Sequence, residues 1–549
     1  MSTPAHPFRP AHPFLPTFCR LVLAIGLLIC ADARAATFYV TNSDGDPTRP
    51  GTLAYELALA NADTSGNTVL SFVAGLGTIY LNDSVTISRP MLWTGPGSDV
   101  TTWPLIAGNN SGEALIIIGA TADQTELRNV IVGEFGGTGI LVQPGATDCT
   151  FSDMRLQNFT GIGIDLSGAA AEVSGVLFQN YSGLGLMVDA GEVAVTDSAF
   201  LRLTGRGIFV TGNGPGTILT AVSVGLSNEI GNVGITLDPG ANGCVLIECS
   251  TAMDSPDQTN ATGLWIASNN NRVFLSQFWG GDTGVLVGGL PGQPWNGLYT
   301  SGNLLSNTGA VANDVLGTGI EFGPGAVANR VQGTYNYNEV YGFNEPTLNG
   351  DSVPNQLNAS IGVRMASATN TGNIVSGMQI FSGYAGVLLS GNAAFNEISY
   401  NQICFGSLGG VVFGTSGEGG SSSNLVSANV IGLYSTPGPA FADAGPQSYG
   451  ALVFAGSIAN TFSYNIVGGQ DFQGLAVFGY DCAYNGFSFN FIAQSNPGLP
   501  VSAQTYAAAI AGYGILFSQT WYNHISGNSF GPTGAGAVGD FGAFNTASP

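Results

Sequence analysis

The 549-residue chain contains no lysine. Its twelve basic residues are all arginines, compared with 35 acidic residues, and no lysine or arginine follows Arg364. Nucleic acids and anionic membrane surfaces are held by basic side chains, so neither is an expected partner. The formal net charge of −23 also disfavours an anionic polysaccharide unless a cation bridges it.

Histidine and cysteine are scarce as well. Two of the three histidines lie within the first twelve residues, which leaves His524 for the rest of the chain. Histidine-based nucleophilic catalysis and histidine-rich copper sites are thereby excluded. Five cysteines follow the N-terminal segment, an odd number without metal-ligand spacing, and we expect them to be small core residues. They are Cys149, Cys244, Cys249, Cys404 and Cys482. No metal site and no cofactor is predicted.

A long hydrophobic run is also absent. The apolar run from Leu21 to Cys30 is too short to span a membrane. It follows Arg9 and Arg20 and precedes the small-x-small triplet Ala33-Arg34-Ala35. These features predict a secretory signal over residues 1–35, with the mature chain secreted to the medium or the periplasm.

Glycine, in contrast, is abundant, with 82 residues, and it marks a repeat. A tetrad Gly-apolar-x-apolar recurs, often at intervals of 21 to 24 residues. The tetrads begin at Gly139, Gly163, Gly185, Gly207, Gly234, Gly263, Gly284, Gly319, Gly362, Gly386, Gly410, Gly450, Gly474 and Gly514. Short strands repeating at this period indicate a solenoid.

A second repeated element lies between the tetrads, clearest from Asn396 to Ile403. An apolar residue follows each of its two asparagines by two positions. These apolar residues are five apart, so both can point inward only if the chain turns between them. We expect the second Asn, as Asn401, at this corner, because Asn tolerates the left-handed conformation. The first Asn of successive repeats should form a ladder of amide hydrogen bonds.

With its Asn-x-Ile and Gly-Ile-x-Leu repeats, the chain resembles the secreted bacterial right-handed parallel β-helix proteins of the pectin-lyase-like class over about residues 110–530. The resemblance implies an all-β, right-handed parallel β-helix of about fourteen or more coils. In this class, loops entering one sheet wall a saccharide groove. The polygalacturonase pattern of Asn-Thr-Asp, Asp-Asp, Gly-His-Gly and Arg-Ile-Lys is absent here.

The ends differ from the repeats. Residues 36–110 are predicted to form the N-terminal cap and first coils, with a capping helix from Thr52 to Ala62, and residues 111–530 the repeat domain. Residues 531–549 are predicted to be a flexible tail. Asn42, Asp44 and Asp46 alternate as in a calcium loop, and a plain polar turn is the alternative that we favour.

The third tetrad residue should point outward from the core. This outward row is apolar at ten of its fourteen positions, and such a patch needs a cover: inserted loops, a second copy of the chain, or a ligand. The row comprises Leu141, Asp165, Met187, Phe209, Thr236, Trp265, Leu286, Glu321, Arg364, Leu388, Val412, Leu452, Ala476 and Leu516.

Aromatic residues in the row and in two inserted loops are candidate ligand-binding residues, because their rings suit stacking on sugars. Packing of loops onto the apolar sheet is the alternative role. The candidates are Trp265, Trp295, Tyr299, Tyr335, Tyr337, Tyr341 and Phe343.

Glu321 and Arg364 hold the outward position on successive coils, which predicts contact between them. They are the candidate catalytic pair, with a structural ion pair as the alternative. The sequence therefore favours a secreted rod that binds a polysaccharide or cell-surface glycan. A polysaccharide lyase, glycoside hydrolase or epimerase, and a surface protein that self-associates through the outward row, remain open.

Overall fold

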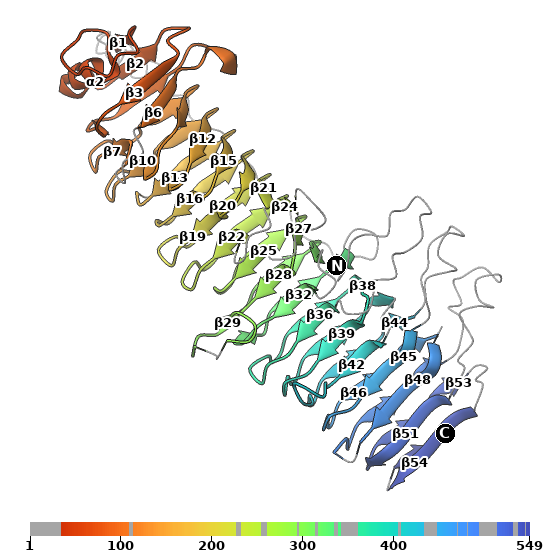
Figure 1. Ribbon diagram of the computed structural model, residues 1–549. Helices are drawn as coiled ribbons and strands as arrows, with labels where there is room; N and C mark the ends of the chain where they lie inside the picture. Colours follow the sequence, from red (N-terminus) through yellow and green to blue (C-terminus); the bar gives the residue numbers. More distant parts are fainter. Residues whose placement is uncertain are drawn as a thin grey trace, which may run out of the picture.

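A computed structural model describes residues 35–108, 114–168, 170–226, 232–253, 261–293, 296–312, 317–333, 339–341, 361–404, 408–432, 447–468, 470–479, 481–492, 513–530, 536–543 and 545–548. The chain winds into a rod of stacked coils (Figure 1). Except at the two ends of the rod, each coil contributes one strand to each of three sheets, and the strands pair in parallel with their equivalents in the next coil.

Sheet 1 contains mostly strands of three residues and runs the length of the rod. Its strands are β1 (Ala36–Val40), β2 (Thr68–Phe72), β5 (Met91–Thr94), β8 (Glu126–Arg128), β11 (Thr150–Ser152), β14 (Glu172–Ser174), β17 (Ala194–Thr196), β20 (Ile218–Thr220), β23 (Val245–Ile247), β26 (Arg272–Phe274), β30 (Leu304–Ser306), β34 (Arg330–Gln332), β37 (Ile374–Ser376), β40 (Glu397–Ser399), β43 (Leu425–Ser427), β46 (Thr461–Ser463), β49 (Gly486–Ser488), β52 (His524–Ser526) and β55 (Thr546–Ser548).

Sheet 2 follows sheet 1 within each coil. Its strands are β3 (Thr78–Leu81), β6 (Leu105–Gly108), β9 (Ile131–Gly133), β12 (Arg155–Phe159), β15 (Leu177–Tyr181), β18 (Ala199–Leu203), β21 (Ser223–Leu226), β24 (Ser250–Met253), β27 (Gln277–Gly280), β31 (Gly309–Ala312), β35 (Glu339–Tyr341), β38 (Gln379–Phe381), β41 (Gln402–Cys404), β44 (Val430–Ile431), β47 (Ile466–Val467), β50 (Phe491–Ile492) and β53 (Ser529–Phe530).

Sheet 3 contains all fourteen tetrads. Its strands are β4 (Val85–Ile87), β7 (Ile116–Ile118), β10 (Thr138–Val142), β13 (Ile162–Leu166), β16 (Leu184–Val188), β19 (Arg206–Val210), β22 (Asn232–Leu237), β25 (Ala261–Ile266), β28 (Thr283–Val287), β32 (Thr318–Phe322), β36 (Ile361–Met365), β39 (Ala385–Leu389), β42 (Gly409–Phe413), β45 (Gln447–Val453), β48 (Gln470–Phe478), β51 (Tyr513–Trp521) and β54 (Gly536–Ala543). Two short strands, β29 (Thr300–Ser301) and β33 (Ala326–Val327), pair beside it.

The predicted fold class, a right-handed parallel β-helix, is confirmed. Inward side chains such as Ile140 and Val142 are fully buried, and one continuous core fills the coils. The five cysteines are free and buried in the core as predicted, and burial raises the pKa of Cys149, Cys244 and Cys249 to about 11. Strands β54 and β55 lie in residues for which a tail is predicted.

The expected capping helix is α2 (Leu53–Ala62), at the N-terminal end of the rod (Figure 1). The side chain of Thr52 caps it by accepting a hydrogen bond from the Tyr55 N–H. Leu53, Leu57 and Ala60 are buried, so α2 covers core that the first coil would otherwise expose. A 3₁₀ turn, η1 (Val100–Thr102), precedes β6.

The predicted asparagine ladder is present, and it is continuous over ten coils. In each step, the side-chain oxygen of one Asn accepts hydrogen bonds from the backbone N–H and the side-chain amide of the Asn in the preceding coil. Its members are Asn271, Asn303, Asn329, Asn373, Asn396, Asn424, Asn460, Asn485, Asn523 and Asn545. A second ladder links Asn401, Asn429, Asn465, Asn490 and Asn528.

The predicted role of the second Asn at the corner was wrong. The left-handed residue is the one before it, for example Tyr400 before Asn401, with φ of 56°. Asn401 itself is fully buried, and its amide donates to the Val375 carbonyl and to Asn429. The turn leaves backbone groups unpaired inside the rod, and a buried amide satisfies them, so the Asn is needed there and not at the exposed corner.

Candidate functional site

The outward row of sheet 3 is in register from coil to coil, as predicted. Trp265 pairs with Leu286, Leu286 with Glu321, and Glu321 with Arg364. From Leu388 to Ala476 the row is buried and forms a second apolar cluster outside the main core. The outer face of this stretch of sheet 3 is therefore covered, which agrees with the expectation that the apolar row has a cover.

The two candidate catalytic residues do contact each other. Arg364 Nη1 donates to Glu321 Oε1 at 2.8 Å. The Glu321 side chain is 4% exposed and that of Arg364 23%. Burial raises the pKa of Glu321 from 4.5 to about 7, although Arg364 opposes the rise, and nearby Glu418 adds to it.

Two further residues complete this polar cluster, and the sequence reasoning missed both. Arg364 Nη2 forms a second ion pair with Glu418 Oε1, and Ser390 Oγ donates to Glu418 Oε2. Glu418 lies in the turn after β42, where its N–H donates to Thr415 Oγ1 at 3.0 Å. Its only sequence signal was an isolated acid in the Gly-rich segment 414–420, whereas Ser390 directly follows the tetrad of β39. The polar cluster thus contains two carboxylates on one guanidinium.

A hollow of about 300 Å³ lies beside the row, near Trp265. Trp265 lines it, and its indole N–H donates to the Gly288 carbonyl at 2.8 Å, which fixes the ring. Leu290, Gln293, Asn296 and Leu298 also line it, and the side chains of Gln293 and Asn296 are amides. Asp238 also lines the hollow, and burial raises the pKa of its carboxyl, a shift that Arg206 opposes. Ring, carboxylate and amides thus converge on one volume.

The candidate aromatic residues are only partly placed. Trp265 lines the hollow, and Tyr299 is exposed on the segment that walls it. Tyr341 lies in β35, of which only the backbone is described. Three aromatics of the long insertion and one of the shorter loop lie outside the described residues: Tyr335, Tyr337, Phe343 and Trp295. Asp238 was missed, although it directly follows the tetrad of β22.

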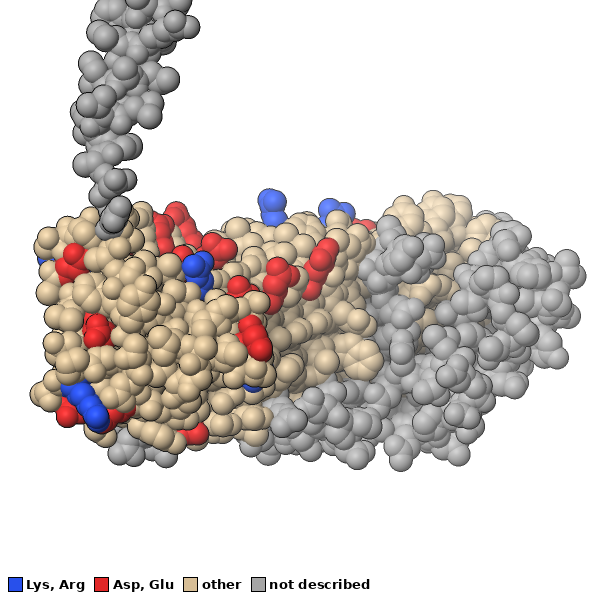
Figure 2. Space-filling model, turned by 90° about the horizontal axis from the view of Figure 1, so that it is seen from above, with Lys and Arg blue, Asp and Glu red and all other residues tan. Residues whose placement is uncertain are grey.

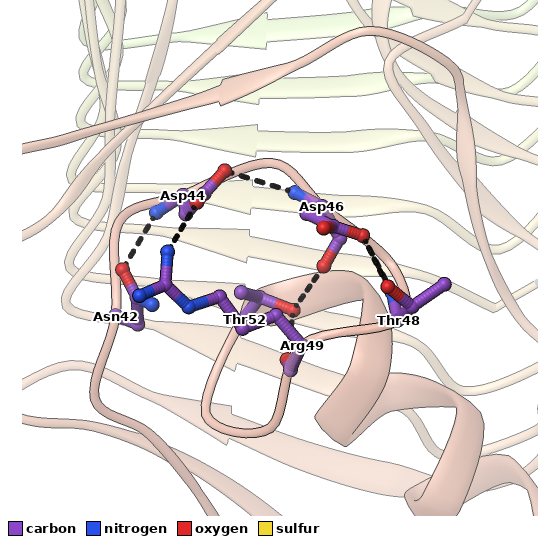
Figure 3. A network of polar contacts seen from close by, with 6 residues as sticks. All are labelled: Asn42, Asp44, Asp46, Thr48, Arg49 and Thr52. Atoms are coloured by element: carbon purple, nitrogen blue, oxygen red, sulfur yellow. Dashed lines mark hydrogen bonds and ion pairs between the residues drawn. The ribbon is translucent and has the colours of Figure 1, made fainter.

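The acidic turn near the N-terminus is a chain of local hydrogen bonds (Figure 3). The Asn42 side chain accepts from the Asp44 N–H, Asp44 accepts from the Asp46 N–H, and Asp46 accepts from Thr48. Arg49 pairs with Asp44 at 2.8 Å. The carboxylates are satisfied by the protein itself, which supports the polar-turn interpretation. Among the described residues, no group of three metal-ligating side chains could hold an ion.

Comparisons with known proteins give structural likenesses only. No family model and no curated protein sequence matches the chain. The tailspike protein of Escherichia coli bacteriophage HK620 in complex with a pentasaccharide is 12% identical, with a TM-score of 0.45, over 83% of this chain and 76% of that one.

Two other similar structures are enzymes by name. The periplasmic alginate epimerase AlgG is 12% identical, with a TM-score of 0.32, over 75% of this chain and 76% of its own. The catalytic domain of a GH87 α-1,3-glucanase, in complex with tetrasaccharides, is 10% identical, with a TM-score of 0.32, over 94% and 69%. The β-helix described above follows from the strand pairing and does not depend on these likenesses. Within the described part of the chain, no helix is long and apolar enough to cross a membrane.

Proposed function

We propose that this β-helix protein binds a neutral glycan on the outer face of sheet 3, in the hollow beside Trp265. The observation that carries the proposal is the convergence of a fixed indole, the Asp238 carboxylate and the amides of Gln293 and Asn296 on a volume of about 300 Å³. Aromatic faces pack on sugar rings, while carboxylates and amides bind hydroxyl groups. The net charge of −23 favours an uncharged ligand over an anionic one.

A catalytic role is the second candidate, and the polar cluster two coils along the row is the reason to keep it. Glu321 has a pKa of about 7, so near neutral pH it can be either a proton donor or an acceptor. Glu418 on the same guanidinium supplies a second carboxylate. A hydrolase, lyase or epimerase reaction on a glycan is the chemistry to test at this cluster.

A self-associating surface protein receives less support. That role would need the apolar row to be uncovered within one chain, yet Leu388, Val412 and Leu452 are buried. Burial varies over the rest of the row, where Leu141 and Met187 are half-buried. Self-association through this row is therefore the weakest of the three alternatives.

A glycan array with the mature chain tests binding, with mass spectrometry of each bound glycan to detect products. We expect Trp265→Ala and Asp238→Asn to weaken binding at least tenfold, and Met187→Ala, an equivalent outward position away from the hollow, to leave it unchanged. Product formed by the parent chain and lost in Glu321→Gln would assign the catalytic role. Binding that survives Trp265→Ala and Asp238→Asn would refute this site.

A further inference from the structure

Five consecutive coils near the C-terminal end of the rod have an aromatic surface that lies on sheet 1, not on sheet 3. From β8 to β52, each sheet 1 strand is bounded by two corner residues, one two positions before the strand and one directly after it, and all of them except Gly333 after β34 are in the left-handed conformation. Around β40, β43, β46, β49 and β52, six of these ten corners are aromatic. They are Phe395, Tyr400, Tyr464, Tyr484, Phe489 and Tyr522, and we call them the corner aromatics.

These rings do not stabilise the core. Their exposure runs from 47% for Tyr522 to 69% for Phe395. A bulky residue at positive φ is strained, and Gly, Asn or Asp would suit each corner better. In the coils before residue 378, the same corners hold no aromatic residue, and Asn129, Asp153 and Gly243 are typical occupants. Strain retained for an exposed ring points to a function of the ring.

The corner aromatics form two rims along the rod axis. Tyr464 stacks on Phe489 with centroids 5.1 Å apart, and Tyr484 on Tyr522 at 5.4 Å, both between adjacent coils. The rims are separated by one three-residue strand, roughly 10 Å. In each pair the stacked rings cover one another's facing surfaces, so the rims present ring edges and the outer sides of the stacks.

The floor between the rims is polar, with Ser399 and Ser463 buried and Ser427, Ser488 and Ser526 half-buried. Its side nearest Tyr400, Tyr464 and Phe489 is an in-register row of hydroxyls: Ser399, Ser427, Ser463, Ser488 and Ser526. The other side holds Glu397, Leu425, Thr461, Gly486 and His524. A Cβ built on Gly486, between Tyr484 and Phe489, would meet no atom within 4 Å, so the floor has room above it there.

We propose that this surface binds an extended neutral polysaccharide that lies along the rod axis, with sugar rings against the corner aromatics and hydroxyl groups on the serine row. A protein interface has an apolar centre and a polar rim, whereas this surface has the reverse arrangement. No Lys or Arg follows Arg364, so an anionic chain has no basic partner here. Aromatic rims flanking hydroxyls fit a ligand that has both apolar ring faces and hydroxyl edges.

The surface is separate from the hollow at Trp265, so the two proposals can fail independently. Retention of the mature chain is measured by affinity electrophoresis in gels containing amylose, laminarin, galactomannan or xylan, with polygalacturonate as the anionic comparison. The triple change Tyr484→Asn/Phe489→Asn/Tyr522→Asn removes three rings and places a corner-compatible residue at each position. We expect it to weaken retention by a neutral polymer at least tenfold.

Two further variants make the test specific. Gly486→Leu fills the open floor at a φ that is not left-handed, and should weaken retention at least fivefold in a chain that still folds. Leu275→Asn replaces an exposed left-handed corner of sheet 1 outside this surface, and should leave retention unchanged.

Three results would overturn the proposal. They are a parent chain that no neutral polymer retards, a triple variant retained like the parent, and a parent dimer that the triple variant dissociates in analytical ultracentrifugation. The last result would assign the surface to a second copy of the chain.

Discussion

At the scale of single residues, Glu321 is the most informative. It was selected because a charged side chain lies at an outward position of an otherwise apolar row, and the structure places it against Arg364. Its burial and its two charged neighbours could not be derived from the repeat, because Glu418 reaches the site from a turn 54 residues away from Arg364. The chemistry of the polar cluster therefore depends on a contact that the repeat does not encode.

The raised pKa of Glu321 predicts a pH dependence of stability. Between pH 4.5 and about 7 the folded state holds a proton on this group that the unfolded state has released. This contribution to the free energy of unfolding is present below pH 4.5 and is lost as the pH rises through about 7. We expect Glu321→Gln to flatten the stability profile in this window, as measured by urea unfolding at several pH values.

Glu126→Gln is the matched control for that measurement, since Glu126 also pairs with an arginine but at the surface. Between pH 4.5 and 7, the free energy of unfolding of this variant should change with pH as steeply as that of the parent. An equal slope in Glu321→Gln and the parent would contradict the assignment of the titration to Glu321.

At the scale of elements, the asparagine ladder stabilises the C-terminal coils. Asn460 accepts two hydrogen bonds from Asn424 and donates to the Ser421 carbonyl and to Asn485. Asn460→Ala removes these bonds and leaves buried groups unpaired, so we expect a loss of about 2–4 kcal/mol in the free energy of unfolding. Chemical denaturation measures this loss.

The control for this prediction is a coil that has no asparagine at the ladder position. Val193 lies one residue before β17, as Asn460 lies one residue before β46, and Val193 is also buried. Val193→Ala removes only apolar contacts and should cost about 1–2 kcal/mol. A loss in Asn460→Ala no larger than that in Val193→Ala would show that the ladder bonds contribute little.

The outward row supplies a second test at this scale. Val412 is fully buried although it lies outside the main core, whereas Leu141, in the same row, is half-buried. A charge at a buried position has no partner, so Val412→Asp should lower the free energy of unfolding by about 3 kcal/mol or more. Leu141→Asp should cost less than about 1 kcal/mol. Equal costs would mean that the row is not covered at Val412.

At the scale of the whole molecule, the charge is acidic and unevenly distributed. On the face in Figure 2, the acidic and basic side chains of the described residues gather toward the N-terminal end of the rod. With a net charge of −23, mutual repulsion opposes folding more than the ion pairs at Arg49, Arg128 and Arg364 favour it.

We therefore expect salt to stabilise the fold. Raising the ionic strength from about 10 mM to about 0.15 M shortens the screening length from about 30 Å to about 8 Å. The thermal midpoint should rise, as followed by circular dichroism, while affinity for a neutral glycan should not change. A midpoint that falls with salt would mean that the ion pairs outweigh the repulsion.

The sequence by itself determined the winding of the chain, because glycines, inward apolar pairs and asparagines recur at one period and each coil repeats the same local rule. Those features predicted the tetrad strands, the outward row, the first asparagine ladder and the Glu321–Arg364 contact. Only the tertiary structure decided which side chains of different coils and turns contact one another. Glu418 reaches Arg364 from a turn outside the repeat pattern, and Gln293 and Asn296 bring their amides to the hollow that Asp238 lines. Tyr400 takes the corner conformation because Asn401 is needed inside to satisfy buried backbone groups.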